Sequence, residues 1–295
     1  MLASAFVETR AIEAVRGEGC GNAYLFVDGP TVGDAITSLV EERGARDTPR
    51  WLDASGDASL DGVILLAPDR DGADRRAIVW NADGSRGEVC GNGLRAAALL
   101  LRERFGAERG ALRSDAGVHE FAFEPDGRVA VGLPPPRFDP DAIGLVPAAC
   151  AGVAADGGPL EVELELEDGA RVRGHALSMG NPHLVLDHLE PIVGVLATGP
   201  TLERHAAFAN RVNVNYAWPL GRERIGLRTF ERGSGETAAC GSGACATAVV
   251  ARHLGWCDDR VVLAQPGGEL EVRLRRDGVT LVGPATLAPP TTLRL

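Results

Sequence analysis

The 295-residue sequence contains no lysine, so all 30 of its basic side chains are arginine. A genome rich in G and C would produce this bias without any functional cause, but the chemical consequence is the same. Enzymes that use pyridoxal phosphate attach the cofactor to a lysine, and P-loop proteins place a lysine beside the phosphates of a nucleotide. The absence of lysine therefore excludes both kinds of chemistry.

Other features that mark common protein classes are also missing. No run approaches the roughly 18 consecutive apolar residues of a membrane span, and the N-terminus lacks the apolar core of a signal peptide. The net charge of −11 opposes binding to nucleic acid or to an anionic membrane surface. We therefore expect a cytoplasmic protein whose partner is a small molecule, and we leave open whether it forms a homodimer.

The cysteines form no Cys-x-x-Cys pair and no tight Cys/His cluster, so we expect no metal site. A chain of this length can build a core without disulfides, and free thiols in a reducing compartment are the simplest expectation. Cys150 and Cys257 are expected to be core filler. The six cysteines lie at positions 20, 90, 150, 240, 245 and 257.

Three blocks of sequence occur twice, in the same order and about 150 residues apart. "GNAYLFVD" at 21–28 resembles "GNPHLVLD" at 180–187, and each is read as a loop leading into a buried strand. "CGNGLRAAALLLR" from Cys90 and "CGSGACATAVVAR" from Cys240 are identical at six of thirteen positions. Segments 117–132 and 268–283 both alternate apolar and polar residues around an Asp-Gly turn, as hairpins do. Together these matches indicate two homologous halves.

The proline-rich stretch 133–141 separates the two halves. We expect an N-terminal domain over 1–133, a C-terminal domain over 134–284, and a tail at 285–295 that returns to the first domain. Helical stretches are expected at 35–43 and 201–209. The runs after Cys90 and Cys240 are apolar all round until Arg102 and Arg252, which predicts buried helices. The expected fold class is α/β (α+β), with two pseudo-symmetric domains, each a curled sheet around a central helix.

The two cysteine segments predict a specific chemistry. Glycines at a helix start let a ligand approach the unpaired N–H groups, which favour an anion such as a carboxylate. The same field should favour a cysteine thiolate. If the two halves face each other, Cys90 and Cys240 would flank one α-carbon, so that one thiolate removes its proton and the opposite thiol supplies another. Such a two-base racemase or epimerase needs no cofactor. The alternative is that these segments have no catalytic role: the glycines only allow close packing, and the cysteines are buried core residues.

Four motifs together resemble the diaminopimelate epimerase family: "NADGSRGEVCGNGLR", "MGNPH", "RVNVNY" and "ERGSGETAACGSGAC". The resemblance covers nearly the whole chain. It implies a cofactor-independent isomerase that interconverts LL- and meso-2,6-diaminopimelate in lysine biosynthesis. It also implies the two-domain fold with a helix inside each curled sheet.

The resemblance assigns roles to individual residues. Cys90 and Cys240 match the acid/base pair, and His183 and Glu231 match the residues that tune these thiols. The backbone donors for the α-carboxylate match Gly91 with Asn92 and Gly241 with Ser242. Residues that match substrate-holding positions, mostly for the distal end, are Asn22, Asn81, Asn181, Asn213 and Arg232, with Glu231 also on the substrate. Taken singly, most of these could instead be turn residues or a solvated ion pair.

The chain departs from the family pattern at three places. Ala23 stands where the family has an acid, Cys20 stands where an apolar residue is usual, and a substrate-side glutamine has no clear counterpart in "ASLDGVILL". Two alternatives therefore remain: a proline or hydroxyproline racemase-type enzyme or another amino-acid racemase of the same fold, and an inactive paralogue that binds a metabolite. The first usually carries histidine where this chain has Asn92.

Overall fold

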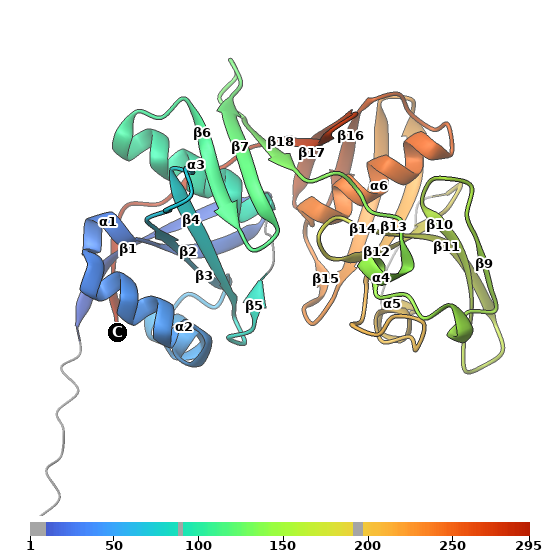
Figure 1. Cartoon of the computed structure of the whole chain (residues 1–295), viewed down its shortest axis with the longest axis horizontal. Helices are drawn as coiled ribbons and strands as arrows, with labels where there is room; N and C mark the ends of the chain where they lie inside the picture. Colours follow the sequence, from blue (N-terminus) through green and yellow to red (C-terminus); the bar gives the residue numbers. More distant parts are fainter. Residues whose placement is uncertain (1–9, 88–90, 191–196) are drawn as a thin grey trace, which may run out of the picture.

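The computed structural model describes residues 10–87, 91–190 and 197–295, which form two lobes side by side (Figure 1). Strands dominate both lobes. The first lobe contains β1 (Ala11–Gly19), β2 (Asn22–Asp28), α1 (Gly29–Val32), α2 (Asp34–Ser55), β3 (Leu60–Ala67), β4 (Arg75–Asn81), β5 (Arg86–Gly87), α3 (Gly91–Phe105), β6 (Arg109–Ser114), β7 (Gly117–Phe123) and β8 (Val129–Leu133).

The second lobe is also built mainly of strands, and none of its helices is as long as α2. It contains α4 (Pro140–Ile143), a 3₁₀ turn (Pro147–Ala149), β9 (Gly152–Ala154), β10 (Leu160–Glu165), β11 (Arg171–Ser178), β12 (Pro182–Asp187), α5 (Gly199–Glu203), β13 (Asn213–Gly221), β14 (Arg224–Glu231), β15 (Gly235–Thr237), α6 (Gly241–His253), β16 (Arg260–Gln265), β17 (Gly268–Arg275) and β18 (Gly278–Gly283). The final strands are β19 (Thr286–Leu287) and β20 (Thr291–Arg294).

The order of strand pairing repeats from one lobe to the other. In the first lobe β2 pairs parallel with β3, β3 antiparallel with β4, and β4 parallel with β6, after which β6, β7 and β8 form an antiparallel meander. In the second lobe β12, β13, β14, β16, β17 and β18 pair in the same order and senses. The same chain path is therefore used twice.

Two connections join the lobes. Strand β8 pairs antiparallel with β18, with Leu133 opposite Val279, so one sheet continues from one lobe into the other. The last strands then return to the first lobe, where β19 and β20 both pair with β1. The C-terminus thus lies beside β1, the first described strand (Figure 1).

Each lobe wraps its strands around one helix. Helix α3 packs against β1, β2, β6 and β8, and α6 packs against strands β11–β14 and β16–β18. Every residue from 91 to 101 is buried. Arg95 is an exception to the apolar character expected for this run. It is 0 % exposed, and its guanidinium donates to the carbonyl oxygens of Gly91 and Pro284. The buried guanidinium therefore links α3 to Pro284, the residue that directly follows β18.

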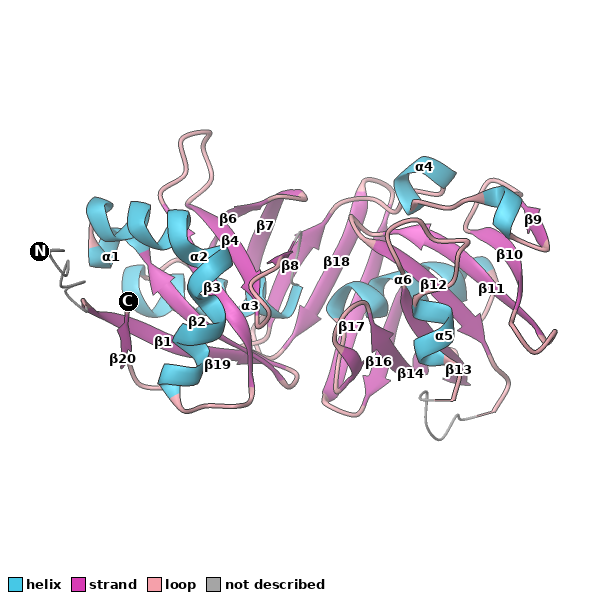
Figure 2. Cartoon of the chain, turned by 90° about the horizontal axis from the view of Figure 1, so that it is seen from below, coloured by secondary structure: helices cyan, strands magenta, loops and turns pink. Residues whose placement is uncertain are grey.

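The two helices expected outside the sheets differ from the prediction. Helix α2 covers the outer face of β3 and β4 and runs 22 residues, through Pro49, well beyond 35–43 (Figure 2). In the second lobe the expected helix at 201–209 is wrong, because α5 ends at Glu203. The ring of His205 accepts a hydrogen bond from the backbone N–H of Ala207, which replaces a helical bond at this point.

None of the helices in the described part of the chain has the length and hydrophobicity that a membrane span requires.

Candidate active site

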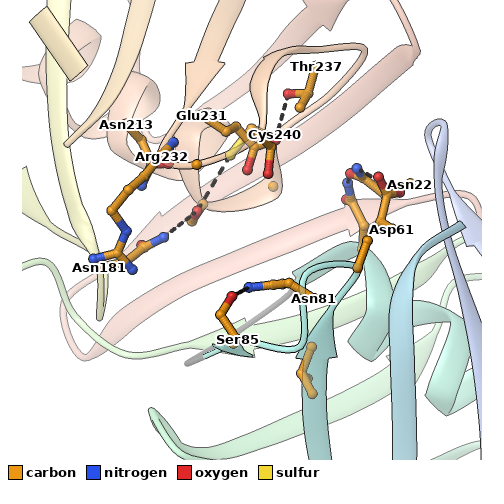
Figure 3. Close-up of a pocket in the computed structure, with 18 of the residues that line it drawn as sticks. Asn22, Asp61, Asn81, Ser85, Asn181, Asn213, Glu231, Arg232, Thr237 and Cys240 are labelled. Carbon is orange, nitrogen blue, oxygen red and sulfur yellow. Dashed lines mark hydrogen bonds between the residues drawn. The ribbon is translucent and has the colours of Figure 1, made fainter. Parts of the chain in front are cut away.

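A cavity of about 580 Å³ lies where the two lobes meet (Figure 3). The first lobe contributes the starts of β2 and β3, the end of β4 and the start of α3. The second lobe contributes the turn before β12, the turn after β14 and the start of α6. Of the predicted site residues, those that line the cavity are Asn22, Asn81, Gly91, Asn92, Asn181, Asn213, Glu231, Arg232, Cys240, Gly241 and Ser242.

The starts of α3 and α6 lie against each other in this cavity. A Cβ atom placed on Gly91 would lie 3.9 Å from the Cα of Gly241, and one on Gly241 would lie 3.6 Å from the backbone nitrogen of Asn92. Both helices therefore direct their first turns and positive ends into one space. An anion such as a carboxylate fits there.

Cys240 is the N-cap residue of α6. Its sulfur accepts a hydrogen bond from Gly243 N at 3.3 Å and lies 3.6 Å from the hydroxyl oxygen of Ser242. Its own backbone N–H donates to the side-chain oxygen of Gln265 at 2.8 Å. The thiol is 4 % exposed and lines the cavity. The helix start and a strand residue thus hold the thiol at the cavity wall.

The expectation that the helix field favours a thiolate is wrong for Cys240. Burial raises the pKa of this thiol well above its usual value, and the neighbouring Glu231 carboxylate raises it further. The hydrogen bonds from Ser242 and Gly243 lower the pKa but do not compensate. Desolvation therefore outweighs the helix dipole, and Cys240 is a protonated thiol, able to donate a proton.

Glu231 lies beside Cys240 at the end of β14. Its carboxylate accepts a hydrogen bond from the Thr237 hydroxyl at 2.5 Å and interacts with the Cys240 thiol. Burial raises the pKa of Glu231, and the negative charge of Asp61 raises it as well. Thr237 was not predicted from the sequence, although it lies in the "ERGSGETAACGSGAC" motif.

The predicted partner thiol, Cys90, lies outside the described residues. Its neighbours in sequence, Gly91 and Asn92, are described and line the cavity.

His183 is the one described candidate that does not line the cavity. Its imidazole is 0 % exposed and lies behind Asn181, with Nε2 2.9 Å from the Asn181 side-chain oxygen. Burial lowers the pKa of His183 to about 3, and the positive charge of Arg232 acts in the same direction. His183 is therefore a neutral imidazole that reaches the cavity only through Asn181.

Asn213 and Arg232 form a second pair. The Asn213 side chain accepts a hydrogen bond from the backbone N–H of Arg232 at 2.9 Å and donates to the carbonyl of Pro182 at 3.0 Å. The buried carboxylate of Glu203 accepts from Gly233 N at 3.1 Å. These bonds fix the turn that carries Arg232. Asn213, at the start of β13, therefore positions an arginine at the cavity wall.

On the opposite wall, Asp61 is a cavity residue that the sequence analysis missed. Its carboxylate accepts hydrogen bonds from Ala23 N at 2.8 Å and from the side-chain nitrogen of Asn22 at 3.3 Å. The Asn22 oxygen in turn accepts from Asn92. Figure 3 shows Asn22 and Asp61 next to each other. Burial raises the pKa of Asp61. Asp61 lies in the "ASLDG" stretch, where the resemblance lacked its glutamine.

The two other departures from the family pattern lie away from the cavity. Ala23 is 1 % exposed and packs in an apolar cluster with Leu25 and Leu60. Cys20 is buried, and its thiol donates to the carbonyl of Glu269. Asn81 donates to Ser85 within a turn, as its sequence "NADGS" suggested, and also lines the cavity. Further lining residues that the sequence analysis did not predict include Tyr24, Asp83, Arg86, Arg211 and Ser234.

Comparison with solved structures defines the class of fold. A hydroxyproline epimerase from Agrobacterium vitis superposes with a TM-score of 0.66 at 16% identity, over 97% of this chain and 92% of that one. A phenazine biosynthesis protein of the PhzF family from Bacillus anthracis superposes with a TM-score of 0.62 at 14% identity, over 97% and 100%. The chain therefore has the mixed α/β fold, rich in strands, that these proteins share.

Sequence comparison defines the family. The family model for diaminopimelate epimerase matches residues 175–288. The diaminopimelate epimerase of Azotobacter vinelandii is 35% identical over 284 residues, which cover 94% of this chain and 97% of that protein. The diaminopimelate epimerase of Pseudomonas syringae pv. tomato is 37% identical with the same coverage. The chain belongs to the diaminopimelate epimerase family.

Proposed function

We propose that this protein is a cofactor-independent epimerase that interconverts LL- and meso-2,6-diaminopimelate, an isomerase of lysine biosynthesis. The observation that carries the proposal is the convergence of the α3 and α6 starts beside the Cys240 thiol, in a chain of this family. A substrate carboxylate bound by both helix starts would place its α-carbon next to that thiol. The helix N–H groups would also stabilise negative charge that develops when the α-proton leaves.

The proposed chemistry uses one thiolate and one thiol. The Cys90 thiolate takes the α-proton, which leaves a carbanion, and the Cys240 thiol donates a proton to the opposite face. The configuration inverts, and the reverse reaction exchanges the two roles. The raised pKa of Cys240 supports its assignment as the acid in the resting protein. His183 and Glu231 keep their proposed roles as residues that tune the thiols.

The second charged end of the substrate would lie away from the helix starts. Arg232, with Asn81, Asn181 and Asn213 around the cavity, would hold the distal carboxylate or support the arginine that does. We add Asp61 to the proposed set, because a carboxylate on the cavity wall complements a substrate ammonium group.

The domain organisation is also a proposal. We propose homologous, pseudo-symmetric domains over 1–133 and 134–284, with the tail 285–295 packed on the first. The repeated order of strand pairing supports this division.

The direct test is incubation of the purified chain with LL-diaminopimelate, with no added cofactor, followed by chromatography that separates LL from meso. We expect a mixture of both isomers. Faster racemisation of proline than of diaminopimelate would replace the proposal with the racemase alternative. Binding of diaminopimelate without turnover would identify an inactive paralogue, although the altered Ala23 offers no support for that alternative because it lies in the core.

A further inference from the structure

A continuous chain of hydrogen bonds leads from strand β13 to the sulfur of Cys240. The side-chain nitrogen of Asn215 lies 3.1 Å from His183 Nδ1, and His183 Nε2 lies 2.9 Å from Asn181 Oδ1. Asn181 Nδ2 then lies 3.4 Å from Ser242 Oγ, and Ser242 Oγ lies 3.6 Å from Cys240 Sγ. Asn215 belongs to the "RVNVNY" motif but had no predicted role.

The first member of the chain has a fixed orientation. Asn215 Nδ2 lies 3.3 Å from two backbone carbonyl oxygens, those of Leu184 and Asn213, which can only accept hydrogen bonds. Its Oδ1 accepts from the hydroxyl of Thr229 at 3.1 Å. Only the nitrogen of the amide can face the carbonyls, and this nitrogen cannot accept a hydrogen bond from His183. Its contact with Nδ1, at 3.1 Å, is the shortest of the three, so Nδ1 is the accepting nitrogen.

This orientation determines every later member of the chain. A neutral imidazole that accepts at Nδ1 carries its proton on Nε2, and it therefore donates to Asn181 Oδ1. The amide of Asn181 then presents its nitrogen to Ser242 Oγ, which accepts. The hydroxyl hydrogen of Ser242 is thereby available to the sulfur of Cys240. All the donors point toward the thiol.

The residues around this series of hydrogen bonds keep His183 neutral. Asn215 and His183 are 0 % exposed and Thr229 is 1 % exposed. The charged side chain that acts on His183 is Arg232, which opposes a second positive charge. At the other end, Glu231 acts on Cys240 with negative charge, and Ser242 and Gly243 act with hydrogen bonds.

A glycine lets the two ends of the chain approach. A Cβ atom at Gly243 would lie 2.4 Å from Asn215 Oδ1 and 3.2 Å from Cys240 Sγ. The second glycine of the Cys-Gly-Ser-Gly motif thus admits the strand residue beside the first turn of α6.

We propose that Asn215 is a positioning residue that holds His183 as the neutral Nε2–H tautomer and so directs hydrogen-bond donors through Asn181 and Ser242 to the Cys240 sulfur. The inference rests on the proposed role of Cys240 as an acid and base. His183 itself transfers no proton in the reaction. Its function is to keep Ser242 available to the sulfur when Cys240 is a thiolate, the form that the reverse reaction requires.

The tautomer is tested by nuclear magnetic resonance of the full chain labelled with ¹⁵N-histidine, with the His183 signals assigned by their loss in His183→Gln. We expect a protonated Nε2 and an unprotonated Nδ1 from pH 5 to pH 9. A proton on Nδ1, or titration of the ring near its usual pKa, would overturn the proposal.

Two variants test the role of Asn215 itself. In Asn215→Asp a carboxylate faces Nδ1 and stabilises a protonated ring, so the pKa of His183 should rise to above about 6, a roughly thousandfold gain in proton affinity. Thr229→Val is the matched control. It removes a buried hydrogen bond to Asn215 but leaves the two carbonyls, so the tautomer should be unchanged. A ring that stays neutral at pH 6 in Asn215→Asp would contradict the assignment.

The far end of the chain is tested by alkylation. Ser242→Ala removes the hydroxyl donor to the sulfur and leaves that of Gly243 N. Iodoacetamide should then modify Cys240 about tenfold more slowly at pH 8, as resolved by mass spectrometry of its peptide. The peptide of the half-buried Cys150 in the same sample serves as the reference. An unchanged rate at Cys240 would show that the chain does not act on the sulfur. None of these measurements depends on turnover. The proposed role of Asn215 can therefore fail while the epimerase activity holds, and the activity can fail while the role of Asn215 holds.

Discussion

Two glutamates of the second lobe differ in how their charge is balanced. Glu271, in β17, is 3 % exposed and accepts hydrogen bonds from Arg128, Arg260 and Arg273. Burial alone would raise its pKa, but the three arginines lower it to about 2. The pKa of Glu231, in the cavity, is raised by burial and by the charge of Asp61. The first carboxylate is neutralised by its surroundings and the second is not.

The difference separates a structural ion cluster from a site prepared for chemistry. Glu271 is locked in one charge state, which holds β17 to β8 and β16. Glu231 lies beside a thiol whose pKa is also raised, and the causes that set its own pKa include no arginine. Substitutions at the two places should therefore damage different properties.

The largest expected effect is at the thiol. Cys240→Ala should reduce epimerisation by roughly 10³-fold or more, because it removes one face of the acid/base pair. The Cys240 sulfur also caps α6, but loss of a cap costs only about 1 kcal/mol, so thermal unfolding should change little. Normal turnover by this variant would contradict the two-thiol mechanism.

The two glutamates themselves give the sharpest contrast. Glu231→Gln should lower kcat by roughly 10²-fold with little change in stability. Glu271→Gln should leave three arginines without their carboxylate and lower the free energy of unfolding by about 3 kcal/mol, with activity retained where the protein is folded. Urea unfolding and kcat are measured for both variants. If the same variant lost both properties, the distinction between the two sites would be wrong.

The first lobe should contribute to substrate affinity. Asp61→Asn should raise KM for diaminopimelate by about tenfold, because an amide retains the hydrogen bond from Ala23 N but loses the attraction for an ammonium group. Asp83→Asn is the matched control, since the Asp83 carboxylate is already bonded to Ser85 within the turn. Equal changes in KM for the two variants would show that substrate affinity depends on the total negative charge at the cavity and not on Asp61 in particular.

Glu271 also predicts how stability depends on pH. Its pKa is lowered in the folded protein, so its contribution is fully present above the unfolded value of 4.5 and is lost as pH falls toward about 2. We expect the free energy of unfolding to fall across this window in the wild type and to fall by about 3 kcal/mol less in Glu271→Gln. If the free energy of unfolding depended on pH in the same way in both proteins, the Glu271 cluster would not be a cause of the loss of stability in acid.

Much of the fold could be predicted because the sequence repeats itself. The paired Gly-Asn and Cys-Gly motifs indicated matching elements, and β2 with β12 and α3 with α6 lie at those places. The early end of α5 at Glu203 could not be predicted, because the chain beyond it is held by a side-chain bond at His205. The length of α2 was hidden by Gly44 and Pro49, two residue types that helix interiors normally avoid but that α2 contains.

The site was predictable where motifs carried it and not where contacts formed across the chain. The motifs supplied Asn22, Asn181 and Cys240. Asp61 and Asn215 were missed, because an aspartate before a glycine and an asparagine in a strand carry no chemistry until the fold places them. The pKa of Cys240 was also wrongly predicted, since the helix start was visible in the sequence but the burial and the Glu231 charge were not.

The central claim is that two thiols exchange protons with the α-carbon of diaminopimelate without a cofactor. The most direct test is incubation of the protein with LL-diaminopimelate in deuterium oxide, with the α-hydrogen followed by nuclear magnetic resonance and proline as the comparison substrate. We expect deuterium to enter the α-position as the meso isomer forms, at a rate far above that for proline, which leaves the polar groups at the distal end unpaired. Tight binding of diaminopimelate without any exchange, or faster exchange with proline, would contradict the account.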